Sequence, residues 1–273
     1  MTGMQPVVEV TKLPPRPSEA HKGTFGKLLV VAGSAGMLGA AVLCARAATR
    51  SGVGLVRVGL PEPLLSLLPL SVPEATTFVA MAGNVKQQLA DADAVVIGPG
   101  LTSNAPTMSL VQAVLQHSKV PVVVDADALN VLAPLTKPLA CQAPLVLTPH
   151  PGEAARLLGT SSALLQADRE AAISALCQQS GALVVLKGKG TLVSDARRCF
   201  TNSTGNPGMA SGGSGDVLSG LLGALLARGL DPFDAACLAV HVHGRAGDVA
   251  RDALGENGMV ASDIIDGIAQ ELR

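Results

Sequence analysis

Residues 202–228, NSTGNPGMASGGSGDVLSGLLGALLAR, join two segments of opposite chemistry. The first segment is rich in glycine, serine and asparagine, so its backbone is free to adopt positive φ. The second segment places valine and leucine at helical spacing, which predicts a buried helix. A flexible polar loop therefore opens directly into the N-terminus of a core helix.

The glycine-rich start of this helix predicts an anion site. The amides of Gly213, Ser214 and Gly215 have no partner within the helix, and they lie at the positive end of its dipole. Asp216 lies at the same end, beside any phosphate bound there. Amides that hold a moving phosphoryl group and a carboxylate that takes a proton suit phosphoryl transfer to a hydroxyl. We therefore predict that Gly213, Gly215 and Asp216 are catalytic.

Ordinary helix capping is the alternative explanation of this stretch. An Asp near a helix start is a common stabilising feature. Capping does not need glycines at positions 205, 208, 212, 213 and 215, because each glycine costs backbone entropy on folding. The glycines favour the anion site. A side chain at 213 would then intrude on the phosphoryl group, so Gly213→Val should damage catalysis more than folding.

Composition excludes several classes of partner. Only 15% of the 273 residues are charged and the formal net charge is −1, so no basic surface for nucleic acid is indicated. Trp and Tyr are absent, which removes the stacking platforms of single-strand binders. The uncharged residues 28–45 approach membrane-spanning length, but glycines interrupt them. The five cysteines form no CxxC pair and indicate a reducing compartment. We expect a cytoplasmic protein that binds neither nucleic acid nor membrane.

Short apolar runs recur along the chain, and most are followed by a helical pattern, which is typical of strands buried on both faces. These runs lie at residues 27–32, 55–59, 94–97, 120–124, 145–147 and 183–186. Residues 191–194 and 198–201 predict an antiparallel hairpin, and the proline-rich residues 1–26 are expected to be irregular. This order predicts an α/β fold, a mostly parallel central sheet with helices on both faces. Without a linker or an internal repeat, we expect a single domain over residues 1–273.

Turns that follow these strands should meet at one edge of the sheet, where open α/β sheets bind ligands. The glycine-rich turn at 33–41 does not match GxGxxG, so close helix packing and ligand contact both remain open. Asp125 and Asp127 could hold Mg²⁺ through water, or Asp127 could cap the next helix. We favour the cap for Asp127, whereas Asp125 has no comparable structural explanation. His241 and His243 are two residues apart and make a poor metal pair.

Six motifs, in order along nearly the whole chain, resemble the ADP/ATP-dependent NAD(P)H-hydrate dehydratases of the ribokinase-like superfamily. They are GSAGMLGAA (33–41), GPG (98–100), DADALN (125–130), TPHPGE (148–153), KGKGT (187–191) and NSTGNPGMASGGSGD (202–216). The resemblance implies a ribokinase-like three-layer sandwich and a hydro-lyase that repairs hydrated NADH or NADPH. In that reaction ADP or ATP phosphorylates the 6-hydroxyl group of the ring, phosphate leaves, and the reduced cofactor is restored.

The resemblance also implies roles for individual residues. Asp216 would contact the substrate and take its hydroxyl proton, while the Gly213 and Gly215 amides hold the phosphoryl group. The nucleotide is expected on Lys187, Gly188, Lys189, Gly190, Thr191 and Gly215. The hydrated cofactor is expected on Ala40 or Ala41, Gly100 and His150. Mg²⁺ is expected with the nucleotide, and Glu153 is its candidate ligand, although His150 stands where relatives usually carry asparagine.

Two other functions remain open on the sequence alone. A ribokinase-like kinase of a small hydroxymethyl vitamin precursor would share the anion site but stop at the phosphoester. A non-catalytic nucleotide-binding module would not need a carboxylate at position 216. A Rossmann dehydrogenase is disfavoured, because its glycine fingerprint is missing. The low number of charges also leads us to expect a homo-oligomer, such as a tetramer.

Overall fold

A ten-stranded sheet forms the centre of the protein in this computed structural model, which describes residues 4–273. The strands are β1 (Gln5–Val7), β2 (Lys27–Val31), β3 (Leu55–Leu60), β4 (Ala75–Val79), β5 (Ala94–Ile97), β6 (Val122–Val124), β7 (Leu145–Leu147), β8 (Leu183–Leu186), β9 (Leu192–Ser194) and β10 (Arg198–Thr201). Their order across the sheet is β1-β10-β9-β8-β7-β6-β5-β2-β3-β4. All neighbours from β8 to β4 are parallel, and β9 is antiparallel to β8 and β10. The predicted mostly parallel sheet and the predicted hairpin are confirmed.

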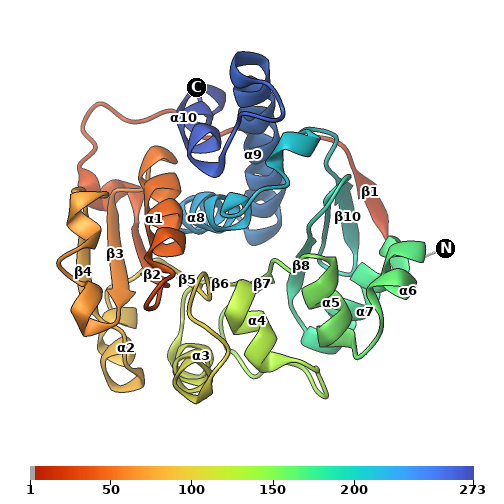
Figure 1. Ribbon diagram of the computed structural model, residues 1–273, viewed down its shortest axis with the longest axis horizontal. Helices are drawn as coiled ribbons and strands as arrows, with labels where there is room; N and C mark the ends of the chain where they lie inside the picture. Colours follow the sequence, from red (N-terminus) through yellow and green to blue (C-terminus); the bar gives the residue numbers. More distant parts are fainter. Residues whose placement is uncertain (1–3) are drawn as a thin grey trace.

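Helices cover both faces of this sheet, which gives three layers (Figure 1). One face carries α1 (Leu38–Arg50), α8 (Ser214–Ala227), α9 (Pro232–Leu254) and α10 (Ala261–Glu271). The other carries α2 (Ala82–Leu89), α3 (Ala105–His117), α4 (Ala126–Leu132), α5 (Pro151–Leu158), α6 (Ser162–Ala167) and α7 (Arg169–Ser180). Short 3-10 helices are η1 (Lys22–Phe25), η2 (Glu62–Leu64), η3 (Leu68–Leu70) and η4 (Pro207–Met209). None of the helices between residues 4 and 273 combines the length and hydropathy of a transmembrane span.

The central strands are apolar throughout because helices bury both of their faces. In β5 every residue is buried, with Ala94 and Val96 in the core beneath α8. Val95 and Ile97 point the other way, into the core beneath α3. Successive strand residues alternate between faces, so a sheet covered on both sides requires the continuous apolar runs seen in the sequence.

The N-terminal segment is more regular than the sequence predicted. β1 adds a parallel edge strand beside β10, with Gln5 opposite Arg198, and η1 forms just before β2. The expectation of irregular structure is therefore wrong for these two elements, and residues 1–3 lie outside the described residues. Pro6 hid β1 from sequence analysis, because proline lacks a ladder donor and is tolerated mainly in edge strands.

α8 lies very close to its neighbours because glycines face them. A Cβ atom at Gly220 would lie 2.1 Å from the Cys44 carbonyl oxygen of α1. A Cβ atom at Gly223 would lie 2.3 Å from Val96 Cγ2 of β5. Only glycine permits these separations, so both residues are required for α8 to lie between α1 and the sheet. This docking brings the N-terminus of α8 to the carboxyl edge of the strands.

The close docking can be tested with an alanine at position 220. We expect Gly220→Ala to lower the free energy of unfolding by about 3 kcal/mol, since its methyl group overlaps the α1 backbone. Gly83→Ala on α2 is the control, because no atom lies within 4 Å of its Cβ position. That control should stabilise the protein by about 0.5–1 kcal/mol through helix propensity. Urea unfolding of both variants measures the difference, and equal effects would contradict close docking.

Candidate active site

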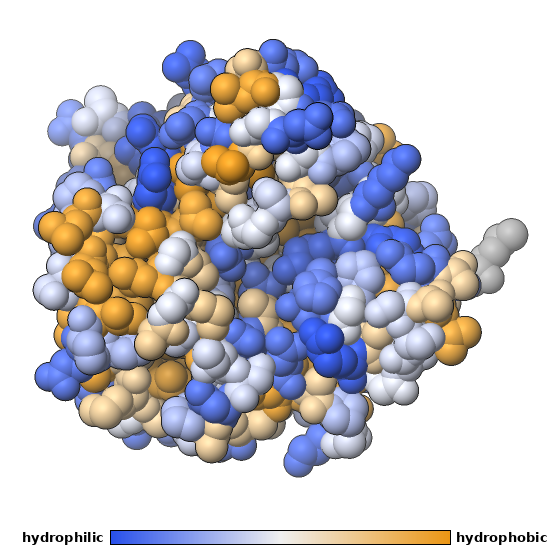
Figure 2. Space-filling view, viewed as in Figure 1, coloured by the Kyte–Doolittle hydropathy of each residue, from blue (hydrophilic) through white to orange (hydrophobic). Residues whose placement is uncertain are grey.

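A cavity of about 1150 Å³ opens at the carboxyl edge of the sheet. Its walls come from the segments after β7 and β8, from the 202–211 loop, and from the facing parts of α8 and α9. Figure 2 shows that this face is hollowed near its centre, where hydrophilic residues gather. The cavity is large enough for a nucleotide-sized ligand. Its lining includes all the residues predicted to bind the nucleotide: Lys187, Gly188, Lys189, Gly190, Thr191 and Gly215.

The start of α8 presents amides without partners to this region. Gly213 is the N-cap and has a φ of 94°. Within residues 4–273, neither the Gly213 amide nor the Gly215 amide donates to a protein acceptor. The Ser214 amide donates to the Ser211 carbonyl oxygen at 3.5 Å, which is long for a hydrogen bond and therefore weak. The helix therefore offers the unsatisfied donors that an anion site needs.

Asp216 lies in the first turn of α8 and is partly buried. Burial, reinforced by the negative charge of Asp125, raises the pKa of Asp216 to about 7. The ammonium group of Lys187 acts in the opposite sense, but it is the weaker influence. A carboxylate with a pKa close to neutrality is suited to general-base catalysis.

A buried ion pair lies beside these groups. Asp125 follows β6 and is 1% exposed, and its Oδ1 is 2.8 Å from Lys187 Nζ. Its Oδ2 accepts a hydrogen bond of 2.7 Å from Ser219 Oγ of α8. Burial opposes the charge on Asp125, but the Lys187 ammonium and the Ser219 hydroxyl keep the pKa of Asp125 below its usual value. Both members of the pair are therefore ionised.

The ammonium group of Lys187 also reaches the start of α8. A Cβ atom at Gly215 would lie 3.3 Å from Lys187 Nζ, so the cation lies next to this residue. Burial disfavours this cation, yet the Asp125 and Glu153 carboxylates raise the pKa of Lys187. A fixed positive charge and unsatisfied amides thus share one corner of the site, which strengthens its attraction for phosphate.

Glu153 and His150 form a reciprocal cap at the start of α5. The His150 amide donates to Glu153 Oε2 at 2.8 Å, and His150 Nδ1 accepts from the Gly152 amide at 3.0 Å. Burial raises the pKa of Glu153. In the part of the chain that the structure describes, no three His, Cys, Asp or Glu side chains group as metal ligands. A Mg²⁺ ion that keeps water and phosphate ligands needs no such group, and Glu153 alone would suffice beside it.

Asp127 does not cap α4, so that prediction is wrong. Asp125 occupies the N-cap position, but its side chain turns toward Lys187. The Asp127 carboxylate accepts from the Thr102 amide at 2.8 Å and from Ser103 Oγ at 3.1 Å. It therefore fixes the loop after β5. The two carboxylates therefore face different partners, and a shared Mg²⁺ ion held through water stays a prediction.

The residues predicted to contact the substrate fall into two groups. His150 lines the cavity, whereas Gly100 and Ala40 lie together near the start of α1. A Cβ atom at Gly100 would lie only 2.9 Å from Ala40 Cβ. The Ala41 side chain is fully buried in the core, so only its backbone could meet a ligand. Contact of these residues with a hydrated cofactor stays a prediction.

Gly213 has a structural role that the sequence did not reveal. A Cβ atom there would lie 2.4 Å from Leu43 Cδ1 of α1 and 3.2 Å from Ala261 Cβ of α10. Its positive φ also strains any other residue. Gly213→Val would therefore strain the backbone as well as crowd the site, and the expectation of a mainly catalytic defect stays a prediction.

Polar residues of the 202–206 segment bind the backbone of α9. Asn202 Nδ2 donates to the Val240 carbonyl at 3.1 Å, and Asn206 Nδ2 donates to the Gly247 carbonyl at 2.8 Å. These bonds hold one wall of the cavity against a long helix. Sequence analysis did not identify this anchoring, nor the role of Ser219, which looks like an ordinary small residue in an apolar helix.

Comparison with known proteins connects this site to a family. The family model described as NAD(P)H-hydrate dehydratase matches residues 28–270. The chain belongs to this family. It is 46% identical to the ADP-dependent (S)-NAD(P)H-hydrate dehydratase of Neisseria meningitidis, over 91% of this chain and 86% of that protein. It is 41% identical to the bifunctional NAD(P)H-hydrate repair enzyme Nnr of Moorella thermoacetica, over 96% of this chain. It spans about half of that bifunctional relative, 52% of its length.

Solved structures of NAD(P)H-hydrate dehydratases share the fold. The ADP/ATP-dependent NAD(P)H-hydrate dehydratase of Bacillus subtilis, co-crystallized with ATP/Mg²⁺, superposes with a TM-score of 0.86 at 34% identity. The match covers 95% of this chain and 93% of that one. A ribokinase-like superfamily protein of Enterococcus faecalis also gives a TM-score of 0.86, at 26% identity, over 100% of this chain and 96% of that one. The predicted ribokinase-like three-layer sandwich is confirmed.

The buried ion pair between Lys187 and Asp125 leads us to expect a large loss of stability when the Lys187 cation is removed. Lys187→Met leaves Asp125 buried without a counter-ion, so we expect a loss of about 3–5 kcal/mol in the free energy of unfolding. Lys187→Met/Asp125→Asn removes both charges and should recover much of that loss. Because the pKa of Asp125 is lowered on folding, its stabilising contribution is lost only as pH falls below about 4. Urea unfolding from pH 3 to pH 8 tests this, and additive effects of the two substitutions would contradict the pairing.

The raised pKa of Asp216 gives the free energy of unfolding a pH dependence opposite to that from Asp125. Its pKa rises from about 3.9 in the unfolded chain to about 7 in the folded one, so its favourable contribution is full below pH 4 and is lost as pH rises through 7. Asp216→Asn should therefore stabilise the protein at pH 8 by about 1–2 kcal/mol and leave it nearly unchanged at pH 4. Asp127→Asn is the matched control and should destabilise, because it weakens the loop after β5. Equal behaviour of the two variants in urea unfolding would refute the raised pKa.

Proposed function

We propose that the protein restores NADH and NADPH from their hydrated forms, using ADP or ATP as the phosphoryl donor. The observation that carries the proposal is the grouping at the start of α8. There, Gly215 lies next to the Lys187 ammonium group, and within residues 4–273 the amides of Gly213 and Gly215 have no protein acceptor. The charge of Lys187 also acts on the Asp216 carboxylate in the first turn of the same helix. These groups supply donors for a phosphoryl group and a base for a hydroxyl. The dehydratase names of the Neisseria and Bacillus relatives support the same chemistry.

The reaction follows from the roles of these groups. The terminal phosphate of the nucleotide binds the amides and Lys187, and the rest of its phosphate chain lies along the 187–191 turn. Asp216 takes the proton of the ring hydroxyl while the hydroxyl oxygen attacks phosphorus and the spent nucleotide departs. The carbon–oxygen bond then breaks, phosphate leaves with the electron pair, and loss of a ring proton restores the double bond. Ala40, Ala41, Gly100 and His150 remain the candidates for holding the hydrated cofactor.

Mg²⁺ is proposed to enter with the nucleotide. The ion would neutralise phosphate charge when bound, and Glu153 with bound water would hold it on the protein side. The buried Glu153 carboxylate, which lies 3.9 Å from Lys187 Nζ, supports this placement. Its position in the cap of α5 fixes the carboxylate without needing the metal.

We further propose that residues 1–273 form one domain and that the protein assembles into a homo-oligomer, such as a tetramer. Its proposed location is the cytoplasm. Apolar side chains gather over the part of the surface that carries α1, β3 and β4 (Figure 2), and exposed apolar residues include Met37 and Leu70. All five cysteines lie within the described residues and are free thiols, which suits a reducing compartment. Light scattering after size-exclusion chromatography tests the assembly.

Product analysis tests the activity. Incubation of the purified protein with each hydrate and each nucleotide should restore the absorbance of the reduced nicotinamide and release one phosphate for each cofactor restored. Omission of the nucleotide should abolish both signals. A stable phosphoester formed from a hydroxymethyl vitamin precursor would instead indicate the rival kinase. Nucleotide binding without any product would indicate a binding module and refute the proposal.

Asp216→Asn tests the base. We expect turnover to fall by about 10²- to 10⁴-fold, because proton removal is lost, while ADP binding measured by calorimetry is kept. In the unsubstituted protein kcat/KM should rise with pH and level off above about 7, since only the ionised carboxylate accepts a proton. Asp266→Asn, on the exposed face of α10, is the control and should retain full activity. Retained turnover in Asp216→Asn would remove Asp216 as the base.

A further inference from the structure

His243 lies on α9 and lines the same cavity as the start of α8. Its Nε2 is 2.9 Å from the Ser214 carbonyl oxygen. A carbonyl oxygen can only accept, so Nε2 must carry the proton and donate it. Burial lowers the pKa of His243 to about 4, so the ring is neutral at physiological pH and remains in this tautomer. The mechanism derived above does not use this histidine.

The bonded carbonyl belongs to the same peptide group as the Gly215 amide. A trans peptide group is planar, so its C=O and N–H point in opposite directions. A hydrogen bond that fixes the Ser214 carbonyl therefore also fixes the direction of the Gly215 N–H. That N–H has no acceptor anywhere in residues 4–273, and its residue lies beside Lys187 Nζ.

The start of α8 is rich in glycine. Three of the four residues from 212 to 215 are glycine, so the backbone there is the most permissive in the site. The helix that carries His243 is itself held in place by the side chains of Asn202, Thr204 and Asn206, which bind its carbonyl groups. A side chain on that fixed helix can therefore add a restraint to the glycine-rich first turn of α8.

We propose that His243 is a positioning residue whose Nε2–H, by holding the Ser214 carbonyl, aims the Gly215 amide at the phosphoryl group in transfer. This inference rests on the proposed function, because it assigns an orienting partner to one of the proposed phosphoryl donors. His243 acts through the peptide group and needs no contact with the substrate. Its neutral ring orients this amide without adding a second cation beside Lys187.

Two substitutions at one position test the proposal. His243→Leu removes the donor, and we expect kcat to fall by about 10- to 100-fold. This is less than the fall in kcat expected when a hydrogen-bond donor to the transition state is itself removed. The KM for the nucleotide and its Kd by calorimetry should change less than about threefold, a split expected for an interaction that matters mainly in the transition state. His243→Gln places an amide N–H near the position of Nε2 and should recover most of the lost kcat.

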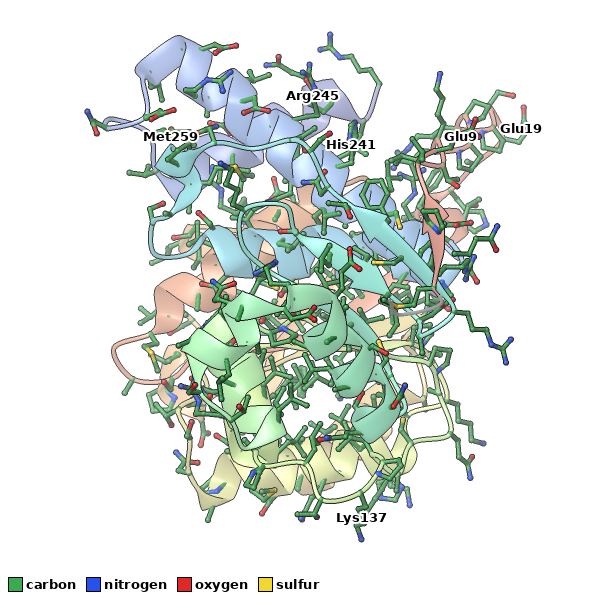
Figure 3. The ribbon with its side chains drawn as sticks, turned by 90° about the vertical axis from the view of Figure 1, so that its right-hand side faces the viewer. Glu9, Glu19, Lys137, His241, Arg245 and Met259 are labelled. Atoms are coloured by element: carbon green, nitrogen blue, oxygen red, sulfur yellow. The ribbon has the colours of Figure 1, made fainter. Side chains whose placement is uncertain are left out.

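His241→Leu is the matched control on the same helix. His241 lies near Arg245 in the upper part of α9 (Figure 3), and the positive charge of Arg245 adds to burial in lowering its pKa. That variant should keep kcat. A His243→Leu variant with unchanged kcat, or with a raised KM at unchanged kcat, would overturn the proposal.

A second measurement is independent of turnover. The Gly215 amide resonance, assigned in ¹⁵N-labelled protein, should shift or broaden in His243→Leu and stay close to the original in His243→Gln and His241→Leu. If the unsubstituted protein restores neither cofactor, the proposed function fails, and this spectrum alone decides whether His243 orients the amide. If His243→Leu does not fold, His243→Gln decides: retained kcat and an unshifted Gly215 resonance support the proposal, and loss of both overturns it.

Discussion

The buried carboxylate of Asp125 is the interaction on which the rest of the site depends. One of its oxygens pairs with Lys187 Nζ at 2.8 Å, and the other accepts from Ser219 Oγ at 2.7 Å. A single side chain thus ties the ends of β6 and β8 to the middle of α8. The pairing fixes the Lys187 ammonium beside Gly215, and the charge of Asp125 raises the pKa of Asp216. The buried charge of Asp125 therefore both positions the Lys187 cation and raises the pKa of the proposed base, Asp216.

Glycine serves α8 in two separate ways. In the middle of the helix, Gly220 and Gly223 allow the approach to α1 and β5 that closes the core. At its start, Gly213 takes a backbone conformation that other residues avoid, and Gly215 leaves room for the Lys187 ammonium. The apolar half of the helix supplies the burial that holds these strained and unsatisfied groups at the edge of the sheet. The apolar part of α8 therefore contributes mainly to the stability of the core, and its first turn carries the residues of the candidate site.

Sequence reasoning worked where a signal was local. The strands β5, β7, β8 and β10 have the predicted bounds, because each is a short run bounded by turn residues. The residues after these strands were recognised as site candidates for the same reason. Interactions between distant segments carried no such signal: Asp125 was noticed as unusual, but its partners lie 62 and 94 residues away. His243 was considered only as a metal ligand, since nothing in the sequence links it to the Ser214 carbonyl.

The charge balance around Lys187 bears on how Asp216 would act in the proposed reaction. The Asp125, Glu153 and Asp216 carboxylates all act on the single Lys187 ammonium group. An ionised Asp216 in this group is repelled by Asp125 and poorly solvated, which is the origin of its raised pKa. In the proposed reaction, uptake of the hydroxyl proton by Asp216 would relieve both penalties as negative charge moves onto the phosphoryl group. The neutral amides and Lys187 would receive that charge, so the proposed transfer would move negative charge away from the carboxylates. The same repulsion that destabilises the folded protein as Asp216 ionises would therefore strengthen Asp216 in its proposed role as the base.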